Sequence, residues 1–229
     1  VQKDMALLFS YNMAFFKDTL PDIYTLFLDY QPQEIGLRLS EEGYLNAVNI
    51  NLGNSPVYAK DPQTFCAEYM DEFIKTPRGF RLNFNKANIL DEDDDVHLST
   101  SNQALDLIYS ELETIRPVQS LSGTANFFIL NGLGLGYILS ELLERVEVNH
   151  LVIIEPHKDL FYFAMHLLDW RQVVDKFSAD HRSLQIIVGD SSEVTFEKVR
   201  INLSNIGPYC AGYSYILDHG AYLVTWICR

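Results

Sequence analysis

The chain has 229 residues, of which 31 are acidic and 17 are basic, so its formal net charge at pH 7 is −14. This charge argues against electrostatic binding of nucleic acids, because proteins hold phosphate backbones with clustered Lys and Arg side chains. Hydrophobic residues make up 48% of the chain and aromatic residues 13%. That composition excludes a disordered chain and predicts a packed core.

The three cysteines, Cys66, Cys210 and Cys228, are too few and too far apart for a disulfide framework or a zinc site. The N-terminus lacks the basic segment and long apolar run of a signal peptide, and no stretch reaches the ~18 to 20 apolar residues that span a bilayer. These features predict a cytoplasmic protein without a membrane span. Because the chain starts at Val1 and ends just after an apolar run, we expect it to be part of a longer protein.

The first part of the chain predicts a small α+β cap over residues 1–100. Residues 3–29 place apolar side chains at helical spacing, with Pro21 suited to the first turn of a second helix. Residues 34–39 and 44–52 alternate on a two-residue period about a turn that ends in Gly43, which predicts a β-hairpin. Residues 65–74 again show the spacing of a helix.

From residue 101 onward the pattern changes to helices that alternate with short apolar runs. Strands are predicted at 127–130, 151–154 and 184–188, and helices at 102–115, 137–146, 160–177 and 192–203. Near the C-terminus, residues 222–228 are predicted to form a further strand, and residues 213–217 compete for the same role. Continuous apolar strands of this kind need helices on both faces of a parallel sheet. The fold class is therefore α/β, with a Rossmann-like sheet over residues 101–229.

An acidic run, Asp91 to Asp95, lies between the two parts and predicts a solvated loop, because neighbouring like charges repel one another. A metal site is the alternative. Metal-binding loops use glycine to turn the chain between ligands, and this run contains none. We therefore predict no metal site here.

A glycine-rich turn is the strongest functional signal in the chain. Gly132, Gly134 and Gly136 follow the strand at 127–130 and precede a helix, so that free helix amides face whatever binds at the turn. Glu155 ends the next strand, 19 residues after Gly136, where a Rossmann-type fold places the acid that binds ribose hydroxyls. Asp190 follows the third strand at the same edge of the sheet. These five residues are predicted to line one crevice.

The ligand of this crevice has alternative interpretations. Tyr137 stands where the dinucleotide fingerprint has its third glycine, which argues against NAD. The spacing resembles that of methyltransferases that bind S-adenosylmethionine. Alternatively the crevice is empty, the glycine turn only seats a helix on a strand, and Glu155 caps the next helix. His157 is similarly open to two interpretations, as an acid or base at a ligand or as a solvated loop histidine.

The chain resembles the motility accessory factors, the bacterial flagellin-glycosylation proteins. In the second half the similarity lies in Asn131 to Tyr137, Ile153 to Pro156, Phe161, Ala164 and Asp169. In the first half it lies in Asn12, Phe15, Phe16, Pro21, Tyr24, Gly53, Pro56, Val57 and Tyr58. The resemblance covers most of the chain, although methyltransferases share the skeleton of the glycine motif.

The resemblance implies the N-terminal domain of a larger protein. Its middle domain would resemble sialyltransferases and would transfer a nonulosonic acid, such as pseudaminic acid, from a CMP-sugar to serine or threonine of flagellin. No transferase residue of the family can be placed on this sequence, so no catalytic residue is assigned. The implied partners are flagellin and the remaining domains. The cofactor is unknown, with a nucleoside-containing ligand such as a CMP-sugar or S-adenosylmethionine as candidate. The alternative function is a small-molecule methyltransferase that uses S-adenosylmethionine.

Overall fold

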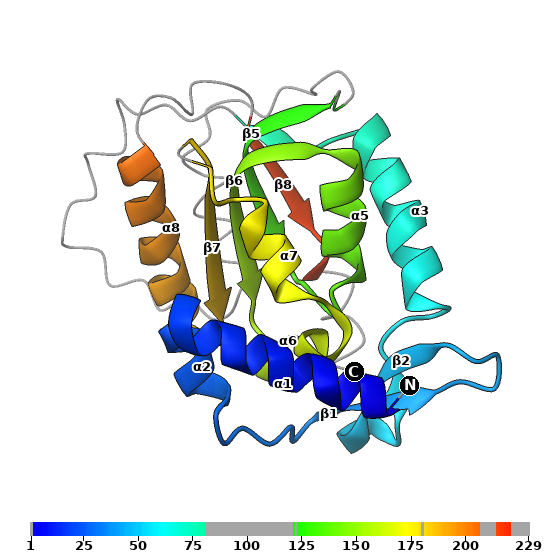
Figure 1. Cartoon of the computed structure of the whole chain (residues 1–229). Coiled ribbons are helices and arrows are strands. Elements are labelled where there is room, and N and C mark those ends of the chain that lie inside the picture. Colours follow the sequence, from blue (N-terminus) through cyan, green and yellow to red (C-terminus); the bar gives the residue numbers. More distant parts are fainter. Residues whose placement is uncertain (1, 81–120, 122, 180, 207–213, 221–229) are drawn as a thin grey trace, which may run out of the picture.

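The computed structural model describes residues 2–80, 121, 123–179, 181–206 and 214–220. A five-stranded sheet forms its centre, in the order β4-β8-β5-β6-β7 (Figure 1). Its strands are β4 (Gly79–Phe80), β5 (Thr124–Asn131), β6 (Glu147–Glu155), β7 (Ser183–Val188) and β8 (Ser214–Asp218). β8, β5, β6 and β7 run parallel, whereas β4 is antiparallel to β8. The three predicted strands therefore share one parallel sheet.

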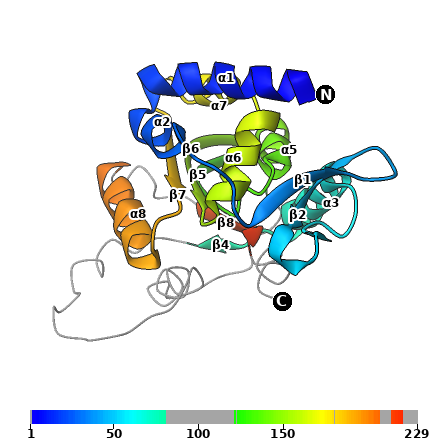
Figure 2. The same ribbon diagram turned by 90° about the horizontal axis from the view of Figure 1, so that it is seen from below.

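The apolar runs form central strands because both faces of the sheet are buried. In β5, Phe127 and Ile129 pack on one face, and Phe128 and Leu130 pack on the other. The first face is covered by α8 (Ser192–Ile206), which contributes Val199. The second is covered by α5 (Tyr137–Arg145), α6 (Lys158–Leu167) and α7 (Trp170–Asp175) (Figure 2). Helices on both faces confirm the predicted α/β class.

The N-terminal segment adds helices and a small second sheet. It consists of α1 (Gln2–Thr19), α2 (Pro21–Phe27), β1 (Ile35–Leu39), β2 (Leu45–Asn49), the 3-10 helix η1 (Ile50–Leu52), β3 (Ser55–Pro56) and α3 (Pro62–Lys75). β1 and β2 form the predicted antiparallel hairpin, whose turn closes with a 2.8 Å bond from the Ser40 amide to the Tyr44 carbonyl oxygen. β3 adds a third, antiparallel strand.

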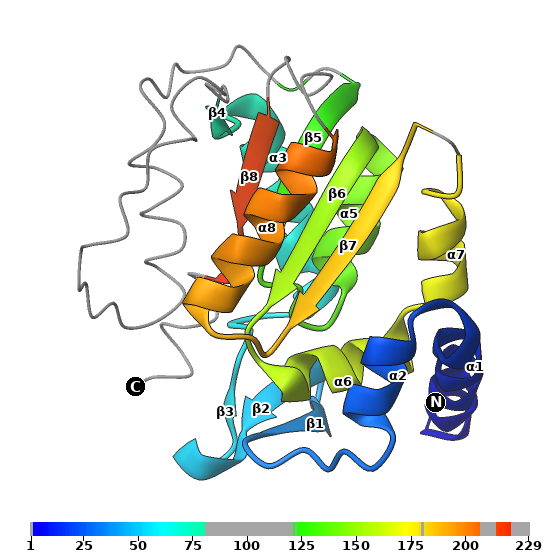
Figure 3. The ribbon, with the colours of Figure 1, turned by 90° about the vertical axis from the view of Figure 1, so that its left-hand side faces the viewer.

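The N-terminal segment packs closely on the parallel sheet and its helices. α1 lies against α6, α3 lies against α5, and β4 enters the central sheet beside β8 (Figure 3). The division into residues 1–100 and 101–229 stays a prediction.

One predicted element is wrong. Residues 160–177 form two helices, α6 and α7, and not one long helix. Leu168 has an extended backbone with φ −117° and ψ 133°, so the helix cannot continue through it. The Asp169 carboxylate then starts α7 by accepting a 3.1 Å hydrogen bond from the Arg171 amide, which is the usual work of an N-cap residue.

Several predicted segments lie outside the described residues. They are the acidic run at 91–95, the helix at 102–115 and the candidate strand at 222–228. The competing candidate at 213–217 corresponds to β8. Within the described part of the chain, none of the helices combines the length and the apolar character needed to cross a bilayer.

Candidate functional site

The glycine turn and Glu155 meet at the carboxyl ends of β5 and β6. Gly132, Gly134 and Gly136 are all buried, and α5 begins directly after Gly136. The Gly132 amide donates a 2.7 Å hydrogen bond to the Ile154 carbonyl oxygen, which extends the pairing of β5 with β6 into the turn. The turn is thereby fixed to the neighbouring strand.

The Glu155 side chain is occupied by backbone amides of the chain itself. Its Oε2 accepts a 2.8 Å hydrogen bond from the Gly134 amide, and its Oε1 accepts one of 2.8 Å from the His157 amide. The residue is only 1% exposed. Burial raises the pKa of Glu155 to about 7, and the hydrogen bonds from these amides oppose that shift. Glu155 thus joins the glycine turn to the start of α6.

The Asp190 side chain lies apart from this arrangement. It is partly exposed, and its Oδ2 forms a 2.5 Å ion pair with the Lys198 ammonium group of α8. The backbone brings its neighbour closer, because the Gly189 amide donates a 2.9 Å hydrogen bond to the Glu155 carbonyl oxygen. The structure therefore brings together the glycine turn and Glu155 by direct bonds, whereas the Asp190 carboxylate pairs with Lys198.

His219 is a residue of this region that the sequence reasoning did not single out. It is fully buried, and its Nδ1 lies 2.9 Å from the Gly132 carbonyl oxygen. That oxygen only accepts, so Nδ1 carries the proton and Nε2 is left to accept from the Cys66 thiol at 3.8 Å. Burial lowers the pKa of His219 to about 4, against the opposing effect of the bond to Gly132. The imidazole is therefore neutral over the physiological range.

A signal for His219 was present in the sequence. The residue directly follows the candidate strand at 213–217, and carboxyl ends of parallel strands meet at one edge of a sheet. Cys66 carries no comparable sequence signal, since it is one of several apolar residues on a predicted helix. Burial raises the pKa of the Cys66 thiol, which leaves it protonated and unreactive.

The strand order reverses between β8 and β5, where open α/β sheets usually bind ligands. Here Asn131 Nδ2 donates a 2.9 Å hydrogen bond to Asp218 Oδ1 across the two strand ends. A Cβ added at Gly132 would lie 2.3 Å from the Gly220 backbone nitrogen, so the two glycine backbones are in close contact. Among the described residues, no group of three or more His, Cys, Asp and Glu side chains is placed to hold a metal ion.

Comparison with known proteins identifies a family and solved structures of similar fold. The sequence profile of the family described as "Glycosyltransferase Maf N-terminal domain" matches residues 8–222. The solved MAf glycosyltransferase from Magnetospirillum magneticum AMB-1 has a similar fold, with a TM-score of 0.67 and 18% sequence identity. The match covers 97% of this chain and 34% of that one, so this chain spans about a third of the relative's length. No curated protein matches. The extent of the profile match shows that this chain belongs to the Maf glycosyltransferase N-terminal domain family.

Proposed function

We propose that the chain is the N-terminal, non-catalytic module of a glycosyltransferase that transfers a nonulosonic acid, such as pseudaminic acid, to flagellin. The whole protein is then needed for motility, and the partners of this module are flagellin and the remaining domains. Membership of the Maf glycosyltransferase family supports the transferase part of this proposal. The length of the solved relative, of which this chain matches 34%, leaves ample room for a separate catalytic domain.

The bonding of Glu155 carries the non-catalytic part of the proposal. A cofactor-binding acid in this position needs an accessible oxygen for the ribose hydroxyls. The two oxygens of Glu155 instead accept the Gly134 and His157 amides at 2.8 Å, and the residue is almost completely buried. This bonding favours the glycine turn as a structural joint between β5 and the helices over a ligand site.

The methyltransferase alternative is tested by binding. S-adenosylmethionine, NAD and a CMP-sugar are added separately to wild type and to Glu155→Ala, and melting temperatures are measured. A ligand at 100 times its dissociation constant stabilises a folded protein by ~2.7 kcal/mol, which is readily seen as a melting shift. We expect no shift with any of the three. A shift with S-adenosylmethionine that Glu155→Ala abolishes supports the methyltransferase and contradicts the non-catalytic module.

The transferase proposal is tested on flagellin. In the source organism the whole gene is deleted, or only the codons for residues 2–220 are removed, and intact flagellin is weighed by mass spectrometry. The full deletion is expected to lower the flagellin mass by whole nonulosonic acid units and to abolish motility. The isolated chain, incubated with flagellin and CMP-pseudaminic acid, is expected to transfer nothing. Unchanged flagellin mass in the deletion strain of an organism that glycosylates its flagellin contradicts the proposal.

A further inference from the structure

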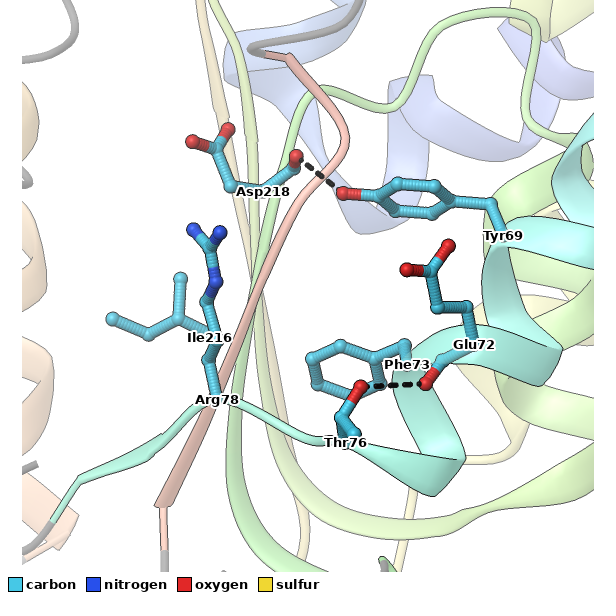
Figure 4. Close-up of a pocket in the computed structure, with 7 residues that line it drawn as sticks. All are labelled: Tyr69, Glu72, Phe73, Thr76, Arg78, Ile216 and Asp218. Carbon is cyan, nitrogen blue, oxygen red and sulfur yellow. Dashed lines mark hydrogen bonds between the residues drawn. The ribbon is translucent and has the colours of Figure 1, made fainter. Parts of the chain in front are cut away.

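A cavity lies between α3 and the end of β8. Its volume is about 220 Å³. Among the described residues, β4 pairs with Ser214 and Tyr215 at the start of β8, and Ile216 and Asp218, further along β8, border the cavity. Tyr69 and Phe73 of α3 form the opposite wall (Figure 4).

The wall on α3 is held firmly in place. The Tyr69 hydroxyl donates a 2.8 Å hydrogen bond to the Asp218 carbonyl oxygen, which ties α3 to the end of β8. The Phe73 ring packs edge-on against Phe128 of β5, with ring centroids 5.7 Å apart. Such anchoring keeps the cavity open before any ligand arrives, which lowers the entropy cost of binding.

Three charged residues line this cavity, Glu72, Arg78 and Asp218. The Asp218 carboxylate accepts a 2.9 Å hydrogen bond from Asn131 Nδ2, whereas Glu72 and Arg78 face the cavity with opposite charges from different elements. Glu72 projects from α3, and Arg78 projects from the connection between α3 and β4, on the far side of the hollow (Figure 4). Among the described residues, neither Glu72 nor Arg78 has an ion-pair partner, and they do not pair with each other. The Thr76 hydroxyl donates a 3.1 Å hydrogen bond to the Glu72 backbone carbonyl oxygen and not to the Glu72 carboxylate.

We propose that this cavity binds a small zwitterion of the size of a free α-amino acid, with its ammonium group at Glu72 and its carboxylate at Arg78. A guanidinium group binds a carboxylate in a bidentate, charge-assisted manner, and a carboxylate accepts from an ammonium group with similar strength. The aromatic wall provides an apolar surface for the side chain of the ligand. A volume of 220 Å³ is below the ~300 to 1,000 Å³ of pockets for drug-sized ligands. A nucleotide or an oligosaccharide is therefore too large for this cavity.

The proposal is tested by titrating the purified protein with glycine, L-alanine, L-serine and L-leucine by calorimetry or ligand-observed NMR. At least one of them is expected to bind with a Kd in the millimolar range or tighter. The N-acetyl derivative and the amide of the best ligand each lack one charge. Each is expected to bind at least about tenfold more weakly, the loss expected when a hydrogen bond to a charged group is removed.

Variants then assign the two charges. Arg78→Gln and Glu72→Gln are each expected to weaken binding of the amino acid by about tenfold. In Glu72→Gln, removing the ammonium group from the ligand is expected to weaken binding no further, because the carboxylate that binds this group is already absent. Lys75→Gln and Glu144→Gln remove the same charges from exposed positions outside the cavity and serve as matched controls. Failure of all four amino acids to bind at 10 mM overturns the proposal, as does undiminished binding in both cavity variants.

Discussion

The Asn12 side chain of α1 accepts a 3.0 Å hydrogen bond at Oδ1 from the backbone amide of Trp170, 158 residues further along the chain. Its Nδ2 donates at 2.8 Å to each of the Met165 and Leu168 carbonyl oxygens. These are the last carbonyl groups of α6 and the first amide of α7, which a helix leaves without partners of its own. One fully buried amide side chain therefore completes both helix ends at the break.

Replacing Asn12 is expected to destabilise the protein strongly. Asn12→Ala removes the partner of the Trp170 amide and of the Met165 carbonyl group, which are buried, and of the Leu168 carbonyl group, which is partly buried. A buried group left without a partner costs about 1–3 kcal/mol. We expect a loss of at least ~2 kcal/mol in the free energy of unfolding, measured with urea. Ser10→Ala, which removes only an exposed bond to the Ala6 carbonyl, serves as the control and should change stability by less than ~0.5 kcal/mol. Equal effects of the two substitutions contradict this account.

The sequence predicts most of the fold because its helices and strands carry local patterns. The strands at 127–130, 151–154 and 184–188 are buried on both faces and therefore show continuous apolar runs. The break at Leu168 has no such pattern, because the apolar spacing of 160–177 continues through it. The partner that makes the break possible is Asn12, which lies in another helix, so only the three-dimensional structure reveals it.

Asp159 ties the start of β1 to α6. Its Oδ2 accepts hydrogen bonds from the amides of Gln33, Glu34 and Ile35 at 3.0, 2.7 and 2.8 Å. Its Oδ1 accepts from the Tyr30 hydroxyl. Burial acts to raise the pKa of Asp159, but the bonds from Tyr30 and the three amides outweigh it, so the pKa lies below its usual value.

Asp159→Asn is expected to lower the free energy of unfolding at pH 7 by ~2 kcal/mol. The charge-assisted bonds from the three amides become neutral ones, and an NH2 group replaces the oxygen that accepts from the Tyr30 hydroxyl. A lowered folded-state pKa gives stability that is present above the unfolded value, here 3.8, and is lost as the pH falls through the folded value. Acid unfolding should therefore be less steep in the variant. Asp18→Asn, at an exposed position, is the control. If Asp159→Asn loses stability at acid pH as steeply as wild type, the Asp159 carboxylate does not have this role in acid unfolding.

Glu155 is expected to make stability fall as the pH rises. Its pKa is about 7 in the folded protein and 4.5 in the unfolded chain, so its contribution is full below pH 4.5 and is lost as the pH rises through 7. The advantage of wild type over Glu155→Gln in urea unfolding should therefore be larger at pH 5 than at pH 8. Glu144→Gln, an exposed change on α5, should show no such dependence. If the difference in unfolding free energy between wild type and Glu155→Gln increases with pH, the raised pKa of Glu155 is contradicted.

His219 should affect the pH dependence of stability in the opposite direction to Glu155, over an overlapping pH range. Its pKa is about 4 when folded and 6.5 when unfolded, so the unfolded chain takes up a proton first and stability falls as the pH drops from 6.5 to 4. His219→Asn keeps a donor for the Gly132 carbonyl but does not titrate, so its unfolding free energy should lack this fall. The exposed His181→Asn should retain it. Because Glu155 and His219 oppose each other, the wild-type profile alone shows little, and only the variants separate the two.

The candidate site shows the limit of local sequence patterns. The spacing of the glycines and Glu155 places them correctly at the ends of β5 and β6, because that placement depends on the order of elements along the chain. The same spacing is compatible with Glu155 facing a ligand or facing the Gly134 amide. The choice depends on how deeply packing buries the carboxyl group, and that is set by residues such as Tyr58, whose hydroxyl accepts from the Leu135 amide at 3.3 Å.

The glycines of the turn should differ in their tolerance of a side chain. Gly132 has φ +84°, and a Cβ there would lie 2.3 Å from the Gly220 backbone nitrogen and 2.4 Å from its Cα. Gly136 has φ +93°, but a Cβ there would meet the side chains of Leu168 at 3.5 Å and Ala164 at 3.7 Å, which are ordinary contacts. Both substitutions to alanine carry backbone strain, whereas only the first also meets immovable backbone atoms.

We therefore expect Gly136→Ala to cost ~1–2 kcal/mol in urea unfolding, the strain of one left-handed residue. Gly132→Ala should cost clearly more, because β8 must move away from β5 to admit the methyl group. If Gly132→Ala yields no folded protein, Gly220→Ala serves as the control, because it adds a methyl group at the other glycine of the contact without a clash. A Cβ at Gly220 would have no neighbour closer than 3.4 Å, so this variant should fold and lose less stability than Gly132→Ala. Equal losses in Gly132→Ala and Gly136→Ala would show that the β8 end does not close over the turn.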